Sequence, residues 1–226
     1  MLEEAINRLT GERVRVRFAG RTDAGVHAAG QVVAFCLARR RRGEGVGWPE
    51  LRRRLNAVLP PDLVVRTLRP APAGFDPRRH ATRRVYSYRI RMVADRRPGE
   101  RHRTLEIGDR LDVVAMRVAA AELVGERDFA AFGSDAHGRT VRRLLEVSIA
   151  QRGTMVVIRV VANAFLRRMV RSMVAVLMEV GRGRLTAGEV AELLRSSERA
   201  LHGRAAPACG LTLERVVYLK TREQEL

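Results

Sequence analysis

The sequence has little lysine, little cysteine and few aromatic residues. Lys220 is its one lysine, so every other basic residue is an arginine. Its two cysteines, Cys36 and Cys209, lie far apart, which excludes a disulfide framework and the paired-cysteine spacing of a metal site. Unpaired cysteines suit a reducing compartment, so we expect a cytoplasmic protein.

Long hydrophobic runs are also absent. Runs such as residues 155–158 and 173–178 are far shorter than the roughly 18–20 apolar residues that span a bilayer. Residues 1–4 do not resemble the basic start of a secretory signal, which an apolar core would follow. We therefore expect neither a membrane anchor nor a secretory leader.

Acidic residues are too few to balance the arginines. Among 226 residues there are 43 Lys+Arg and 25 Asp+Glu, a formal charge of +18. Such a surplus indicates a polyanionic partner, and the planar arginine fork suits phosphates. Codon bias explains arginine in place of lysine, but it does not explain the surplus charge. Membrane-surface binding is less favoured than nucleic-acid binding, because no basic amphipathic helix with aromatic anchors is present.

The apolar patterns predict an α+β fold with mainly antiparallel sheets. A polar, Pro- and Gly-containing segment at 95–103 predicts a boundary between an N-terminal half, 1–94, and a C-terminal half, 95–226. Gly11 should end the first helix, and an arginine run at 39–42 should lie in a loop. We expect helices at 2–10, 48–58, 112–124, 165–180 and from 186, and strands at 14–18, 31–37, 63–65, 85–90, 144–150, 155–161 and 211–219.

The loop at residues 20–28, GRTDAGVHA, lies between two expected strands and contains one carboxylate, Asp23. Its two glycines allow close backbone approaches, and loops at sheet ends often hold functional groups. The same pattern also fits an ordinary turn with aspartate as a turn former. A phosphate loop of the Walker type is excluded, because no Gly-Lys-Ser/Thr follows.

Taken with GQVVAF at 30–35, this loop resembles the signature of the bacterial tRNA pseudouridine synthase A family. The resemblance extends along nearly the whole chain. Further matching segments are RVYSY at 84–88, RDF at 127–129 with Phe132, RT at 139–140, NAFLRRMVR at 163–171 and EVGRG at 179–183. The family implies two ferredoxin-like halves with a basic cleft between them, and a homodimer.

The resemblance also implies a reaction: isomerisation of uridine to pseudouridine at positions 38, 39 and 40 of the tRNA anticodon stem-loop. No group is transferred and no net redox change occurs, so no cofactor is expected. Asp23 matches the essential carboxylate, which either attacks C1′ or assists elimination to a glycal. A nearby guanidinium favours its charged form. The resemblance assigns catalytic roles to Asp23, Arg21, Tyr86 and Arg171, and substrate binding to Tyr86, Arg21, Arg84, Arg167 and Arg168.

Several of these residues have simpler interpretations. A helical wheel places Arg171 opposite an apolar stripe, as expected of a solvated arginine, and a strand tyrosine such as Tyr86 more often only packs. Tyr88, on the same strand face, is expected to be structural. His27 and His80 lack ligand spacing, so we expect no metal site, and His27 should pack within its loop.

One part of the family pattern is missing. Family members usually begin with a strand bearing Tyr-Asp-Gly, before the helix that here starts at Leu2. We therefore expect the N-terminal half to lack its first strand. Two alternative functions stay open: a synthase acting on other uridines, and a non-catalytic RNA-binding protein, for example one associated with the ribosome.

Overall fold

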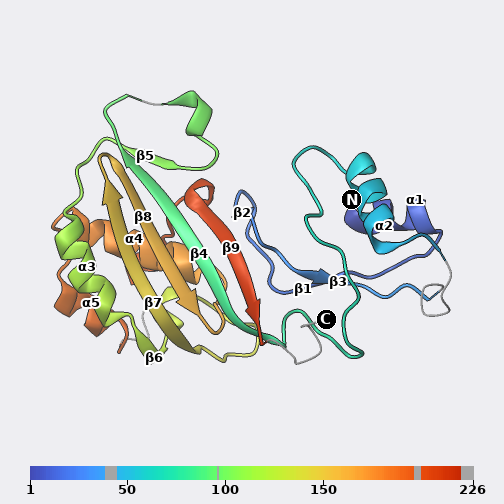
Figure 1. The fold of residues 1–226 in the computed structure, drawn as a ribbon. Coiled ribbons are helices and arrows are strands. Elements are labelled where there is room, and N and C mark those ends of the chain that lie inside the picture. Colours follow the sequence, from blue (N-terminus) through green and yellow to red (C-terminus); the bar gives the residue numbers. More distant parts are fainter. Residues whose placement is uncertain (39–44, 96, 196–199, 220–226) are drawn as a thin grey trace. The chain divides into compact units, whose positions relative to one another are not determined.

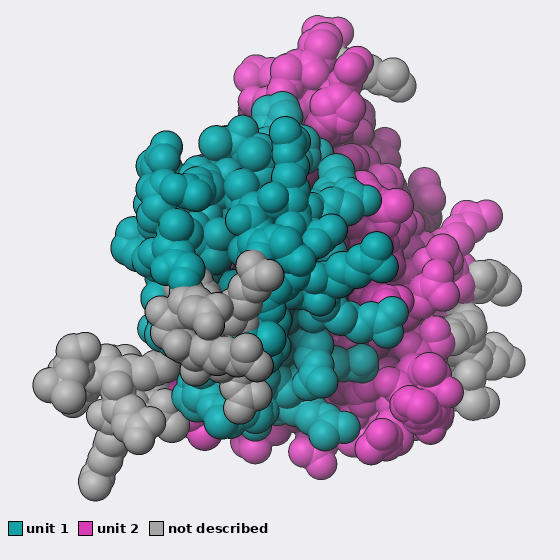
Figure 2. Space-filling view, turned by 90° about the vertical axis from the view of Figure 1, so that its right-hand side faces the viewer, with its two compact units in different colours: residues 1–20, 32–80 teal, residues 21–31, 81–226 magenta. Residues whose placement is uncertain are grey.

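The structure, a computed structural model, describes residues 1–38, 45–95, 97–195 and 200–219. The arginine run at 39–42 lies outside these residues. The chain divides into two compact units, coloured separately in Figure 2: residues 1–20 with 32–80, and residues 21–31 with 81–226. The predicted α+β class with mostly antiparallel sheets is confirmed. The division at residue 94, the ferredoxin-like halves and the basic cleft stay predictions.

The first unit contains two helices and a two-stranded antiparallel sheet. Helix α1, Leu2–Thr10, ends as predicted at Gly11. Gly11 has a left-handed φ of 71°, which glycine adopts readily because it has no Cβ. Helix α2, Trp48–Val58, has a proline in its first turn, where the missing N–H costs nothing. Strand β1, Arg17–Phe18, pairs with β3, Val33–Ala34, and both are shorter than predicted. The buried residues Ile6, Leu51 and Leu55 form the centre of this unit's core.

Residues 63–65 form no strand, so that prediction is wrong. The side chain of Asn56, on α2, replaces a partner strand here. Its Oδ1 accepts a hydrogen bond from the Val65 N–H at 2.7 Å, and its Nδ2 donates to the Val65 carbonyl oxygen at 3.0 Å. The backbone N–H and carbonyl groups of Val65 are therefore satisfied, yet the segment belongs to no sheet.

The second unit is built on a seven-stranded sheet (Figure 1). Its order is β2-β9-β4-β8-β7-β6, and β5 pairs with β4. Pairing is antiparallel except between β2 and β9 and between β4 and β5. The strands are β2 His27–Ala28, β4 Ala81–Met92, β5 Leu105–Ile107, β6 Gly125–Asp128, β7 Val141–Arg152, β8 Met155–Ala162 and β9 Leu211–Tyr218.

The second unit also has three helices, α3 Val113–Glu122, α4 Met169–Gly181 and α5 Ala187–Leu193, whose buried residues share one hydrophobic core with the sheet. Thr186 and Glu189 form a capping box at the start of α5, where the sequence predicts a helix from residue 186. Short 3₁₀ turns lie at Pro98–Glu100, Ala130–Phe132, Ala200–Gly203 and Ala208–Gly210. Within the described residues, no helix is long and apolar enough to cross a membrane.

Helix α4 begins four residues later than the expected Phe165. Arg168 has a left-handed φ of 64°, which no helical residue adopts. Just before it, the Arg167 N–H donates to the Ser134 carbonyl oxygen at 3.0 Å. Gly133 packs so closely that a Cβ there would lie 2.5 Å from the Leu166 Cβ. These contacts with a distant segment hold residues 165–168 outside the helix, which the apolar pattern alone does not reveal.

Candidate active site

The loop that carries Asp23 is held against strand β9. Strand β2 follows the loop and pairs in parallel with β9, with Ala28 opposite Leu213. Gly30 comes so near β9 that a Cβ would lie 2.3 Å from the Glu214 carbonyl oxygen. Gly25 has a positive φ of 79°, and its N-terminal neighbours form a turn closed by the Val26 N–H and the Asp23 carbonyl oxygen at 3.1 Å. Both glycines therefore serve backbone conformations that a side chain would disturb.

The Asp23 carboxylate forms an ion pair with Arg171, in the first turn of α4. The Arg171 Nη1 lies 2.8 Å from the Asp23 Oδ2, and the two side chains are 17% and 26% exposed. The Arg171 Nε donates to the Ala206 carbonyl oxygen at 2.7 Å, while the Ala206 N–H donates to the Arg171 carbonyl oxygen at 3.0 Å. Arg171 is therefore no solvated arginine. It is fixed on two sides, and it fixes where the carboxylate points.

Tyr86 lies near this pair, on the central strand β4 between Leu213 of β9 and Val160 of β8. The ring of Phe165 meets it edge-on, with centroids 5.1 Å apart. Burial raises the pKa of Tyr86 to about 12, with the charge of Arg84 acting in the opposite direction and that of Asp23 in the same one. The phenol is therefore neutral at physiological pH, and the charge of Asp23 reaches it.

Arg84 and Asn163 connect the strands that carry the site. The Arg84 guanidinium donates to the carbonyl oxygens of Ala81 and Asn163. The Asn163 Oδ1 accepts from the Ala164 N–H at 2.7 Å and from the Arg143 N–H at 3.1 Å. Asn163 therefore anchors the turn from which Phe165 reaches Tyr86. Neither Asn163 nor Phe165 is among the residues that the sequence assigns to the site, although both lie in the matching segment 163–171.

The remaining arginines of the predicted site are exposed. Arg21 lies at the start of the loop, and Arg167 and Arg168 precede α4. Within the described part of the chain, these three side chains form no ion pair. The left-handed backbone conformation of Arg168 costs roughly 1–2 kcal/mol in a non-glycine residue. Arg168 also lies at the N-terminus of α4, where the positive end of the helix dipole favours an anion. These guanidinium groups are available to an anionic ligand.

The other tyrosine of this strand and His27 have structural contacts. Tyr88 is fully buried, and its hydroxyl donates to the Pro207 carbonyl oxygen at 2.7 Å. Burial raises the pKa of Tyr88 as well. The His27 Nε2 hydrogen-bonds the His102 carbonyl oxygen. Among the residues that the structure describes, no group of three or more His, Cys, Asp or Glu could hold a metal ion.

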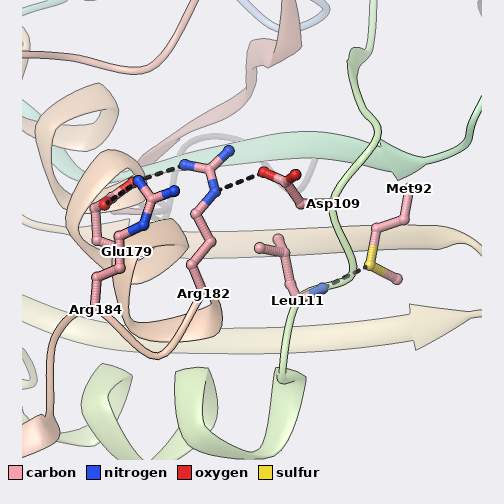
Figure 3. A network of polar contacts seen from close by, with 6 residues as sticks. All are labelled: Met92, Asp109, Leu111, Glu179, Arg182 and Arg184. Atoms are coloured by element: carbon pink, nitrogen blue, oxygen red, sulfur yellow. Dashed lines mark hydrogen bonds and ion pairs between the residues drawn. The ribbon is translucent and has the colours of Figure 1, made fainter.

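A polar network holds the far end of α4 (Figure 3). Arg182 hydrogen-bonds Glu179 at 2.7 Å and Asp109 at 2.9 Å, and Arg184 reaches the same glutamate at 3.2 Å. Burial alone would raise the pKa of Glu179, but the hydrogen bonds from both arginines outweigh it and lower that pKa. The segment before α3 is tied to this end, since the Asp112 N–H donates to the Gly181 carbonyl oxygen at 2.8 Å. The same segment is tied to β4, since the Leu111 N–H donates to the Met92 sulfur. The helix that carries Arg171 is thereby fixed at both ends.

Comparison with known proteins identifies the family of this chain. A family model described as tRNA pseudouridine synthase matches residues 119–219. A tRNA pseudouridine synthase A from Geobacter sulfurreducens is 42% identical over 222 residues, 96% of this chain and 87% of the relative. Another from Myxococcus xanthus is 42% identical over 223 residues, 96% of this chain and 82% of the relative. The chain belongs to the tRNA pseudouridine synthase family, whose members are isomerases that act on tRNA.

Proposed function

We propose that this enzyme converts uridine to pseudouridine at positions 38, 39 and 40 of the tRNA anticodon stem-loop, and that Asp23 is its essential carboxylate. The observation that carries the proposal is the pairing of Asp23 with Arg171 at 2.8 Å, close to the neutral phenol of Tyr86. We also propose a homodimer, as the family resemblance implies, in the cytoplasm, which the unpaired cysteines suit.

The proposed reaction is balanced without a cofactor. The N1–C1′ bond breaks, the uracil turns, a C5–C1′ bond forms, the C5 proton leaves, and N1 takes up a proton. Asp23 either attacks C1′ to form a covalent ester, or removes the 2′ proton to give a glycal. Each route starts from the ionised carboxylate, and the guanidinium of Arg171 compensates that charge and aims it.

The neutral state of the Tyr86 phenol limits the part it can take in proton transfer. With a pKa of about 12, its phenol does not serve as a preformed phenolate base at neutral pH. Its ring offers a face for the target uracil, and its hydroxyl accepts the C5 proton only while giving up its own. Phe165 holds this ring edge-on.

The substrate uridine lies in a base-paired stem or beside one, so it must leave the stack before Asp23 reaches its ribose. In this proposal Arg21 fills the space of the extruded base or binds the backbone around it. Arg84, Arg167 and Arg168 bind the RNA, where phosphate contacts fix position and carry no sequence information. The exposed guanidinium groups of Arg21, Arg167 and Arg168 support these roles.

Tritium release from C5-labelled uridine tests the proposal. The substrates are tRNA transcripts that retain labelled uridine at position 38, 39 or 40 alone, and a transcript labelled only elsewhere. We expect release from the first three and none from the fourth. Release from the fourth alone would support a synthase for other uridines. Tight binding without release from any transcript would support the non-catalytic RNA-binding alternative.

A further inference from the structure

The segment between β4 and β5 leaves the sheet and returns to it (Figure 1). We call residues 97–103 the strap. At its base, the Val93 N–H donates to the Ile107 carbonyl oxygen at 2.8 Å, and the Arg97 N–H donates to the Glu106 Oε1 at 2.9 Å. An ion pair between Arg91 and Glu100 ties the strap to β4. These hydrogen bonds and this ion pair therefore fix the strap against β4 and β5.

The end of the strap reaches the elements that carry Asp23. The His102 carbonyl oxygen hydrogen-bonds the Nε2 of His27, a residue of the same loop as Asp23. One residue after the strap, the Thr104 carbonyl oxygen faces the Cys209 thiol at 3.9 Å. That side of the catalytic loop is also closely packed, since a Cβ on Gly25 would lie 3.2 Å from the Ala208 Cβ. The strap and the catalytic loop thus share one end of the sheet.

The strap carries more positive charge than its contacts use. Arg97, Arg101 and Arg103 are exposed, and the strap's one acidic residue, Glu100, is paired with Arg91. Arg101 donates from its Nε to the His102 ring at 2.9 Å. The side chains of Arg97 and Arg103 bond to no residue that the structure describes. Arg101 also forms no ion pair with a described residue, so all three guanidinium groups can bind a phosphate without first breaking one. Arg101 and Arg103 flank His102, the strap residue that contacts the loop of Asp23.

We propose that Arg101 and Arg103 of the strap bind phosphates of the tRNA strand that flanks the target uridine. The strap would hold the backbone beside the catalytic loop while the uridine is out of the stack. This inference rests on the proposed function for the identity of the RNA, but its binding test does not require turnover.

The test compares two double variants that remove the same charge. Arg101→Ala/Arg103→Ala alters the strap. Arg152→Ala/Arg195→Ala is the matched control, because both arginines are exposed and lie in the second unit, at the end of β7 and beyond α5. Filter binding with an anticodon stem-loop RNA, over a series of salt concentrations, gives Kd and its salt dependence. Tritium release is measured in parallel.

For the strap variant we expect Kd to rise about 10-fold and the slope of log K against log salt to become shallower by about 1–2, as for one or two lost phosphate contacts. The control should change Kd by less than about 3-fold. Arg101→Lys/Arg103→Lys, which keeps the charge, should recover most of the affinity. Equal losses in the strap variant and the control, or native affinity in the strap variant, would overturn the inference.

Binding and turnover separate this inference from the proposed function. If the native chain releases no tritium while the strap variant still binds RNA more weakly than the control, the proposed catalysis fails and the strap remains an RNA contact. If the native chain releases tritium and the strap variant binds as tightly as the native chain, only the strap inference fails.

Discussion

The Oδ2 of Asp23 and the Nη1 of Arg171 lie 2.8 Å apart although 148 residues separate them in the chain. Two contacts bring them together. The loop of Asp23 is held by the pairing of β2 with β9, and Arg171 is held by the backbone of Ala206. Both contacts lie within the second unit, so one compact part of the chain contains the carboxylate, its guanidinium partner and Tyr86.

Substitution of Arg171 tests whether its fork positions the carboxylate. Arg171→Ala leaves Asp23 and the Ala206 carbonyl oxygen without their partner, and we expect kcat to fall about 100-fold, the usual cost of a misplaced catalytic group. Arg171→Lys keeps the charge but cannot serve both acceptors in the same geometry, so its kcat should lie between that of native enzyme and Arg171→Ala. Single-turnover tritium release measures both. A kcat for Arg171→Ala within about 3-fold of the native value would contradict this role.

The raised pKa of Tyr86 predicts that the folded chain loses stability at alkaline pH. Its pKa is about 12 in the folded chain, against about 10 for an unperturbed tyrosine. The folded value is the higher one, so the stabilisation is complete below pH 10 and is lost as pH rises towards 12. The native chain should lose up to about 3 kcal/mol more than Tyr86→Phe over this range. Urea unfolding at pH 9 and pH 12 measures the difference. Equal losses in the two proteins would show that Tyr86 is not buried as described.

Asn163 should act through Phe165 and Tyr86. Asn163→Ala removes the oxygen that accepts from the Ala164 and Arg143 N–H groups, whereas Asn163→Asp keeps an acceptor there. We expect kcat to fall about 10-fold in the alanine variant with little change in KM, and most of the rate to return in the aspartate variant. The same kcat in both variants would contradict a positioning role for this oxygen.

A side chain at Gly30 should disturb the loop that carries Asp23. A Cβ at this position would lie 2.3 Å from the Glu214 carbonyl oxygen of β9. This oxygen belongs to the backbone, so it cannot rotate away as a flexible side chain could. Gly30→Ala should therefore push β2 from β9, lower stability by roughly 1–3 kcal/mol, and reduce turnover. Gly108→Ala is the matched control, because nothing lies within 4 Å of its Cβ position. Thermal unfolding of the two variants checks the difference, and equal melting temperatures would contradict the close approach.

The sequence predicts those parts of the fold that local chemistry determines. Gly11 ends α1, and Thr186 with Glu189 starts α5, because caps involve residues only a few positions apart. The start of α4 was missed, since the left-handed Arg168 depends on packing against the distant Gly133. The expected strand at 63–65 was wrong because the Asn56 side chain supplies its hydrogen bonds.

The sequence likewise indicates some residues of the candidate site and not others. Asp23 stands out through its loop motif, and Tyr86 through the arginine-flanked strand. Arg171 resembles a solvated arginine on the helical wheel, because the pattern of one helix contains no information about the loop that pairs with it. The link from His27 to the strap joins segments 75 residues apart, and no periodicity predicts such a contact.

The replacement of Asp23 by asparagine tests the central claim most directly. Asparagine keeps the shape of the side chain but has no ionisable carboxylate, and Asp62→Asn, at an exposed position without a site role, is the matched control. Tritium release from C5-labelled uridine and filter binding of tRNA are measured on both variants. The account predicts that Asp23→Asn abolishes release while tRNA affinity changes little, and that Asp62→Asn behaves as the native chain. Substantial residual turnover in Asp23→Asn would contradict it.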